Sequence, residues 1–86
     1  MDAMKVLYFA WLRERIGKAE EEIAFPPSIR NAGEAMAHLA SLGEEYAYAF
    51  ENPAIIRIAL DRKHVPHETP LGSAREMAFF PPMTGG

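Results

Sequence analysis

Residues 31–43 read Asn-Ala-Gly-Glu-Ala-Met-Ala-His-Leu-Ala-Ser-Leu-Gly, and this stretch decides the fold class. Its apolar residues recur at steps of three and four, which predicts an amphipathic helix with one face toward a core. Asn31 followed by Glu34 resembles a capping box, and Gly43 suits the end of a helix. The apolar positions of this face are Ile29, Ala32, Met36, Leu39 and Ala40.

Short apolar runs on both sides of this helix predict strands. They cover residues 3–10, 18–25, 54–60, 65–68 and 76–80. We expect a connection at 11–17 that Gly17 ends, a further helical turn at 44–50 and a turn at 61–64. A lone helix between two hairpin-like units must cover one face of a mixed sheet. The order ββαββ(β) therefore predicts an α+β domain over residues 1–80, most simply of the β-grasp (ubiquitin-like) type.

The composition excludes several classes of protein. Eighty-six residues make one small domain, and a hydrophobic share of 49% is that of a globular protein. A net charge of −3 lacks the positive field that nucleic-acid backbones require. Without cysteine there is no disulfide framework, thiolate zinc site or cysteine nucleophile. No apolar run approaches the ~20 residues of a membrane span. We therefore predict a cytoplasmic domain with no nucleic-acid or membrane partner.

Alternation within the strands predicts what each face of the sheet carries. The face under the helix takes Val6, Tyr8, Ile56, Ile58, Met77 and Phe79. The opposite face takes Lys5, Leu7, Phe9, Arg57, Ala59, Ala78 and Phe80. Leu7, Phe9 and Phe80 are large apolar residues rimmed by charge, which is typical of a partner-binding surface. The alternative is that residues 11–17 or the C-terminal tail shield them.

The body of the domain offers no convincing site for chemistry. His64 and His67 are three residues apart, but a zinc ion would need further ligands. We interpret both as solvated loop histidines, and the carboxylates of residues 20–22 as a solvated strand face. Arg13 and Arg15 are either ordinary surface residues or contacts for an acidic ligand or partner. We predict no metal site and no active site here.

The last six residues, 81–86, read Pro-Pro-Met-Thr-Gly-Gly and form a predicted extended tail. Two prolines cannot continue a sheet, and their stiffness would project the tail from the body. Six extended residues reach at most ~20 Å. Because glycine lacks Cβ, Gly85 and Gly86 can enter a narrow channel and leave the terminal carboxylate unhindered. The tail is therefore the candidate for chemistry.

Both ends of the chain resemble one known family. The ending Phe79-Phe80-Pro81-Pro82-Met83-Thr84-Gly85-Gly86 resembles the C-terminal signature of the MoaD family, the small sulfur-carrier subunits of molybdopterin synthase, within the ThiS-like, ubiquitin-like superfamily. Lys5-Val6-Leu7-Tyr8-Phe9-Ala10, with Leu12-Arg13-Glu14 and Gly17, is also similar to that family. One departure is Ser73-Ala74-Arg75-Glu76, where family members often have a Gly-Asp turn.

The resemblance implies a function for the tail. The Gly86 carboxylate would be adenylated by an E1-like (MoeB-like) enzyme that uses ATP, and then converted to a thiocarboxylate by a sulfur donor. The tail would insert into a large, MoaE-like subunit, and sulfur would pass to cyclic pyranopterin monophosphate to build the dithiolene of molybdopterin. The chain would be the non-catalytic subunit of this sulfurtransferase, with the acid–base groups on the large subunit, in a two-plus-two heterotetramer. It would bind no cofactor itself.

The same resemblance implies two groups of contact residues. The residues that thread into the partner are Pro81, Pro82, Met83, Thr84 and Gly85. Phe9 and Phe80 map to positions where the family packs against its partner, and Leu7 and Arg13 complete the predicted partner-binding set.

Three alternatives remain open. Sulfur carriers of thiamine biosynthesis or tRNA thiolation share the diglycine and the fold, although Phe79-Phe80-Pro81-Pro82 favours molybdopterin synthesis. A ubiquitin-like modifier would instead be conjugated through Gly86 to lysines of other proteins. The third alternative is an interaction domain whose Gly-Gly ending is incidental.

Overall fold

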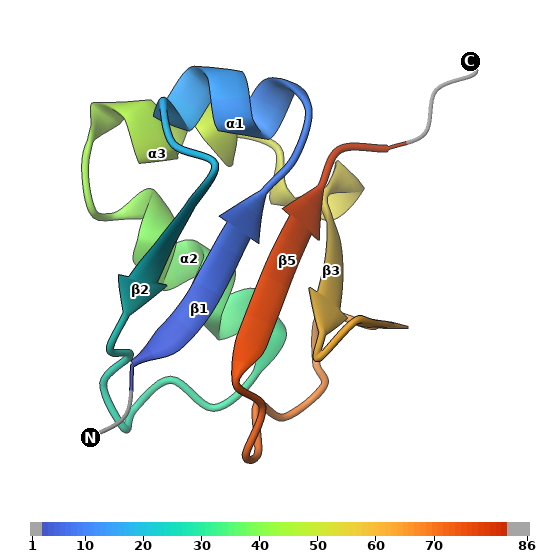
Figure 1. The fold of residues 1–86 in the computed structure, drawn as a ribbon. Helices are drawn as coiled ribbons and strands as arrows, with labels where there is room; N and C mark the ends of the chain where they lie inside the picture. Colours follow the sequence, from blue (N-terminus) through green and yellow to red (C-terminus); the bar gives the residue numbers. More distant parts are fainter. Residues whose placement is uncertain (1–2, 83–86) are drawn as a thin grey trace.

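A mixed sheet and a layer of helices make up the computed structural model of the chain, which describes residues 3–82 (Figure 1). Its elements are β1 Met4–Tyr8, α1 Trp11–Ile16, β2 Glu20–Ile23, α2 Ala32–Ala40, α3 Glu44–Ala49, the 3₁₀ turn η1 Pro53–Ile55, β3 Arg57–Leu60, β4 Lys63–Val65 and β5 Glu76–Phe80. The predictions made for Met83, Thr84, Gly85 and Gly86 lie outside the described residues. No helix within residues 3–82 is long and apolar enough to cross a membrane.

The five strands are ordered β2-β1-β5-β3-β4. The neighbouring strands β1 and β5 run parallel, and every other neighbouring pair is antiparallel. The first and last strands of the chain thus lie side by side, with the helices on one face of the sheet (Figure 1). This is the α+β β-grasp arrangement predicted from the order of elements. Because β1 and β5 are parallel, their C-terminal ends lie next to each other at the same end of the sheet.

Helix α2 forms where its periodicity predicted it. The Glu34 N–H donates to the Asn31 side chain over 2.8 Å, so Asn31 is the N-cap. The Glu34 carboxylate accepts from the Arg30 N–H over 2.7 Å rather than from its cap residue. The helix ends at Ala40, and Gly43 precedes α3 instead of ending α2. The buried residues of α2 are Ala32, Ala35, Met36 and Leu39, and they belong to the same core as Val6, Tyr8, Ile58, Met77 and Phe79.

Trp11–Ile16 form the helix α1, which corrects the connection expected at 11–17. Leu12 and Ile16 are four residues apart and both buried, so they contribute one face of α1 to the core. Gly17 has a φ of 86° and ends the helix in the left-handed conformation that glycine adopts most easily. Because α1 packs into the core on the helical side, it does not shield the opposite face of the sheet.

The second hairpin has a shorter turn than the one expected at 61–64. Asp61 and Arg62 both have positive φ and form its turn, so β4 spans Lys63–Val65 and Pro66 ends it. The strand expected at 65–68 was therefore wrong in position. The Asp61 carboxylate also accepts from the Arg75 and Glu76 N–H groups at 3.0 and 3.1 Å, which fixes the start of β5.

Two other expected strands were too wide. The strand predicted at 18–25 shortens to β2, and the strand predicted at 54–60 begins only at Arg57 because Pro53 starts a 3₁₀ turn. The further helical turn expected at 44–50 is confirmed as α3.

Candidate functional site

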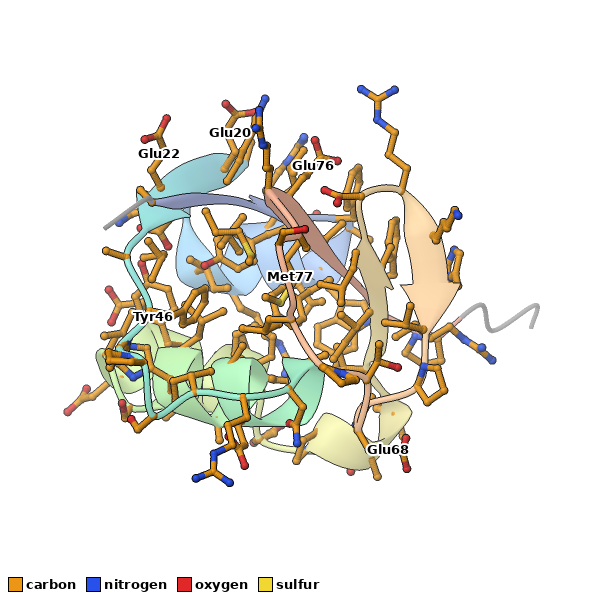
Figure 2. The ribbon with its side chains drawn as sticks, turned by 90° about the horizontal axis from the view of Figure 1, so that it is seen from below. Glu20, Glu22, Tyr46, Glu68, Glu76 and Met77 are labelled. Carbon is orange, nitrogen blue, oxygen red and sulfur yellow. The ribbon has the colours of Figure 1, made fainter. Side chains whose placement is uncertain are left out.

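The face of the sheet away from the helices, called the open face below, carries the candidate site. Its residues are Lys5, Leu7, Phe9, Glu20, Glu22, Arg57, Ala59, His64, Glu76, Ala78 and Phe80. Figure 2 shows Glu20, Glu22 and Glu76 projecting from this side of the sheet, whereas Met77 and Tyr46 lie between the layers. The predicted division of the strand residues between two faces is thus confirmed.

The open face has an aromatic centre at the edge where β1 and β5 end. The rings of Phe9 and Phe80 stack with their centroids 4.6 Å apart and their planes 8° apart. His64 stacks on the same Phe80 ring at 5.3 Å. Phe9 is 39% exposed, and its N–H donates to the Phe79 carbonyl over 3.2 Å. The backbone therefore holds an exposed aromatic surface in a fixed position, as the partner-surface interpretation requires.

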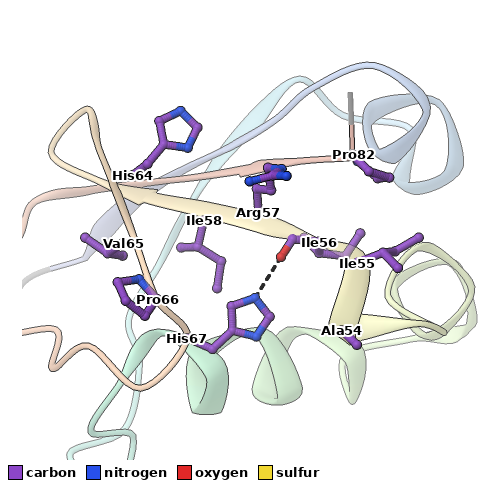
Figure 3. Close-up of a pocket in the computed structure, with 10 residues that line it drawn as sticks. All are labelled: Ala54, Ile55, Ile56, Arg57, Ile58, His64, Val65, Pro66, His67 and Pro82. Atoms are coloured by element: carbon purple, nitrogen blue, oxygen red, sulfur yellow. Dashed lines mark hydrogen bonds between the residues drawn. The ribbon is translucent and has the colours of Figure 1, made fainter. Parts of the chain in front are cut away.

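The base of the tail leaves the sheet beside this aromatic pair. Pro81 and Pro82 follow Phe80 directly, and both are half-buried. Pro82 also lines a groove of about 610 Å³ whose other walls come from η1, β3 and β4 (Figure 3). The structure thus places the start of the tail between the open face and this groove.

Two further predicted partner residues lie in different surroundings. Leu7 is half-buried and pairs in register with Ala78, so it extends the apolar centre of the open face. Arg13 is exposed on α1, and within residues 3–82 no hydrogen bond or ion pair joins its side chain to the open face. Its role in partner binding stays a prediction.

His64 and His67 do not form a metal pair, because their side chains separate. His64 lies on β4 against Phe80, whereas His67 Nε2 is 2.7 Å from the Ile56 carbonyl oxygen inside the groove (Figure 3). The interpretation as solvated loop residues is wrong for the half-buried His67 and misses the stacking of the exposed His64. Across residues 3–82, no group of three or more His, Asp or Glu side chains is placed to hold a metal ion.

A hydrogen-bonded cluster joins β2 to β1 and α3, and the sequence interpretation missed it. The Tyr8 and Tyr46 hydroxyls donate to Glu21 Oε2 at 2.8 and 2.7 Å, and Lys18 Nζ donates to Glu21 Oε1 at 3.0 Å. Glu21 is therefore no solvated carboxylate, although Glu20 and Glu22 are exposed as expected. The signal was the position of Glu21 in β2, whose alternation turns it toward the helical side.

The electrostatics of this cluster favour structure over proton transfer. Burial opposes ionisation of Glu21, but hydrogen bonds from Tyr46, Tyr8 and Lys18 outweigh it and lower the pKa of the carboxyl. Burial, with the hydrogen bond to Glu21, raises the pKa of Tyr8 far above its ordinary value. Near neutral pH the carboxylate is thus ionised and Tyr8 protonated, so the cluster holds the elements together.

Arg15 has a structural partner rather than an open position for a ligand. Its guanidinium lies between the rings of Trp11 and Tyr48, at 4.4 and 4.0 Å from their centroids. It also donates to the Tyr48 carbonyl over 3.1 Å and pairs with Glu51 at 3.4 Å. These contacts bind α1 to α3, so the option of an acidic ligand at Arg15 finds no support in the geometry.

Comparison with known proteins places this architecture in a family. The ThiS family matches residues 6–86, and the chain belongs to that family. Among curated relatives, the molybdopterin synthase sulfur carrier subunits of Haemophilus influenzae and Escherichia coli are each 34% identical to the chain, with 96% of this chain and 99% of each relative covered. The resemblance to the MoaD family is thereby confirmed.

A solved structure agrees on the fold. The small archaeal modifier protein 1 of H. volcanii superposes with a TM-score of 0.73, covering 96% of this chain and 100% of that one, at 18% identity. At this identity the likeness concerns the β-grasp fold alone.

Proposed function

We infer that the chain is a sulfur carrier of molybdenum cofactor biosynthesis, acting as the small subunit of a molybdopterin synthase. The observation that carries this inference is the 34% identity, over nearly the full length, to two sulfur carrier subunits of that synthase. The tail base lies beside a stacked aromatic pair, of which Phe9 is exposed and Phe80 half-buried, and this supports the inference because a carrier must present its terminus together with a surface for docking.

The chemistry proposed for Gly86 begins with activation of a carboxylate. An E1-like, MoeB-like enzyme transfers the adenylyl group of ATP to a carboxylate oxygen, and pyrophosphate leaves. A sulfur donor then attacks the acyl carbon, the C–S bond forms, and the bond to AMP breaks. The sulfur of the resulting thiocarboxylate forms a bond to a carbon of cyclic pyranopterin monophosphate, and water then cleaves the bond between that sulfur and the Gly86 carbonyl carbon, which restores the carboxylate. A chain without cysteine can handle sulfur in this way, because the sulfur is carried on the terminal carbonyl carbon.

Delivery requires a partner with its own catalytic groups. A MoaE-like large subunit receives the tail, with Pro81, Pro82, Met83, Thr84 and Gly85 in the entry channel. Phe9, Phe80 and Leu7 pack against that subunit, and Arg13 is a further contact in this proposal. The two-plus-two assembly and the cytoplasmic location belong to the same proposal.

Intact-mass measurement of the chain from its native host tests the carrier role. A fraction of the protein is expected to have one oxygen replaced by sulfur, and a variant lacking Gly86 serves as the control that cannot be loaded. Carboxylate alone under sulfur-replete conditions would refute the carrier role, and covalent adducts to host proteins would indicate a modifier instead. A loaded chain that gives no dithiolene product with the large subunit would point to the thiamine or tRNA pathway.

A further inference from the structure

Arg57 occupies a position that links the open face to the tail base. It begins β3, and its register partner on β5 is Phe80, the central ring of the aromatic surface. Arg57 is exposed and, together with Pro82, lines the groove where β4 diverges from β3 (Figure 3). Any protein that covers Phe80 and takes up the tail must therefore also cover this guanidinium.

The charges around Arg57 are not balanced by the chain itself. Two nearby cations have carboxylate partners. Lys5 Nζ, on the open face, lies 3.8 Å from Glu20, and Arg62 Nε, in the turn between β3 and β4, lies 4.0 Å from Glu76. Within residues 3–82 no ion pair involves Arg57. The ten residues that line the groove include His64 and His67 but no Asp or Glu. A chain with a net charge of −3 thus presents a positive site at its tail base.

Docking changes the energetics of an unpaired guanidinium. Water solvates the charge of an exposed arginine, so that exposure carries no free-energy penalty. Removing the guanidinium from water without a partner is unfavourable. A carboxylate can offset that loss through two parallel hydrogen bonds to the planar guanidinium fork. A subunit that covers Phe80 therefore binds well only if it places an acidic group opposite Arg57.

We propose that Arg57 is a specificity-determining residue of the docking face, and that it pairs with an Asp or Glu carboxylate of the large subunit beside the entrance for the tail. This inference rests on the proposed function, which supplies the large subunit as occupant of the face. The groove is lined by Arg57 and by no carboxylate, so it favours an acidic partner segment. Because Arg57 is in register with Phe80, the partner that covers the Phe9–Phe80 surface also reaches the groove. The pairing lets the chain distinguish a large subunit with this carboxylate from one without it.

Titration calorimetry with the large subunit of the same organism tests the pairing. Arg57→Gln is expected to weaken binding roughly tenfold, and Arg57→Glu roughly a hundredfold, because truncation leaves the partner's carboxylate unpaired and reversal adds repulsion. Arg57→Lys retains the charge and loses the fork, so its loss is expected to be smaller than that of Arg57→Gln. The matched control is Arg30→Glu, which makes the same change in net charge at an exposed residue before α2.

The outcomes separate this inference from the proposed function. Binding by Arg57→Glu within about twofold of Arg30→Glu, with tight binding by the unaltered chain, overturns the pairing and leaves the carrier role standing. No binding by the unaltered chain overturns the proposed function and the pairing with it. Thermal unfolding of each variant verifies its fold. If Arg57→Glu fails to fold, the comparison of Arg57→Gln with Arg30→Gln decides in the same way.

Discussion

Replacing Glu21 by Ala tests whether one carboxylate joins β2 to β1 and α3. The Tyr8 side chain is only 1% exposed, and its hydroxyl donates to Glu21 over 2.8 Å. Without the carboxylate, this buried hydroxyl loses its acceptor, which costs about 1–3 kcal/mol, and Tyr46 loses one hydrogen bond worth about 1 kcal/mol. Glu21→Ala should therefore lower the free energy of unfolding by about 2–4 kcal/mol.

The expected loss is large enough to measure in a domain of this size. At about 4–8 °C per kcal/mol, a loss of about 2–4 kcal/mol lowers the melting temperature by roughly 8–32 °C. Urea unfolding at neutral pH, followed by the fluorescence of Trp11, gives the free energy directly, since this is the chain's single tryptophan. Glu22→Ala is the matched control, because Glu22 lies on the same strand but is exposed, and it should change stability by less than about 0.5 kcal/mol.

A double-mutant cycle with Tyr8→Phe identifies the cause of the loss. Tyr8→Phe alone removes one hydrogen bond and should cost about 1 kcal/mol. In the double variant there is no longer a buried hydroxyl without an acceptor, so the combined loss should fall short of the sum by about 1 kcal/mol or more. If the two losses add within about 0.5 kcal/mol, or if Glu21→Ala matches Glu22→Ala, the proposed role of the cluster is refuted.

Three further predictions follow from the same structure. The pKa of Glu21 is lowered from its ordinary value of 4.5, so the contribution of its carboxylate to the free energy of unfolding is present above pH 4.5 and is lost as the pH falls through the lowered pKa. The difference in stability between the chain and Glu21→Gln should therefore stay constant near neutral pH and shrink in acid. Urea unfolding midpoints measured across this pH range test the prediction. Phe9→Ala should reduce binding of the large subunit about tenfold or more in calorimetry while Leu42→Ala, at an equally exposed apolar residue away from the open face, leaves it unchanged. Gly17→Ala should lower the free energy of unfolding by about 1 kcal/mol, measured in urea, because Gly17 has a φ of 86° that residues with a Cβ adopt with strain. No atom lies within 4 Å of an added Cβ, so the loss would come from the backbone and not from a clash. Unchanged stability would contradict this explanation.

The sequence predicted the fold where local pattern and tertiary packing agree. The three- and four-residue steps of α2 and the alternation of the strands each require a buried face, and packing of the helix on the sheet provides one. The cap at Asn31 is a local hydrogen bond that needs no tertiary contact. The prediction failed at α1, where a six-residue helix has too few turns for a clear period and only Leu12 and Ile16 mark the buried side. The turn expected at 61–64 was correctly placed but too long, because neither Asp61 nor Arg62 is a glycine and nothing in the sequence signals that both adopt positive φ.

The candidate site was predictable only in part. Phe9 and Phe80 are far apart in the sequence, but the prediction that they share a face followed from strand alternation and from a sheet that brings the two strands together. The stacking of His64 on Phe80 depends on the register of β4, which is set by the position of the turn. Of the three donors to Glu21, only Lys18 is near it in the sequence; Tyr8 and Tyr46 come from distant segments, so no local spacing reveals the cluster.

In the proposed function, a sulfur atom carried on Gly86 reaches a pterin precursor through a large subunit. The most direct measurement mixes the thiocarboxylated chain with the large subunit and cyclic pyranopterin monophosphate in a single turnover, and follows both the mass of the chain and the dithiolene product. We expect product to form while the chain returns to its carboxylate mass, and a variant lacking Gly86 to give none. A chain that keeps its sulfur in the presence of both components, with no dithiolene formed, would refute the carrier role in this pathway.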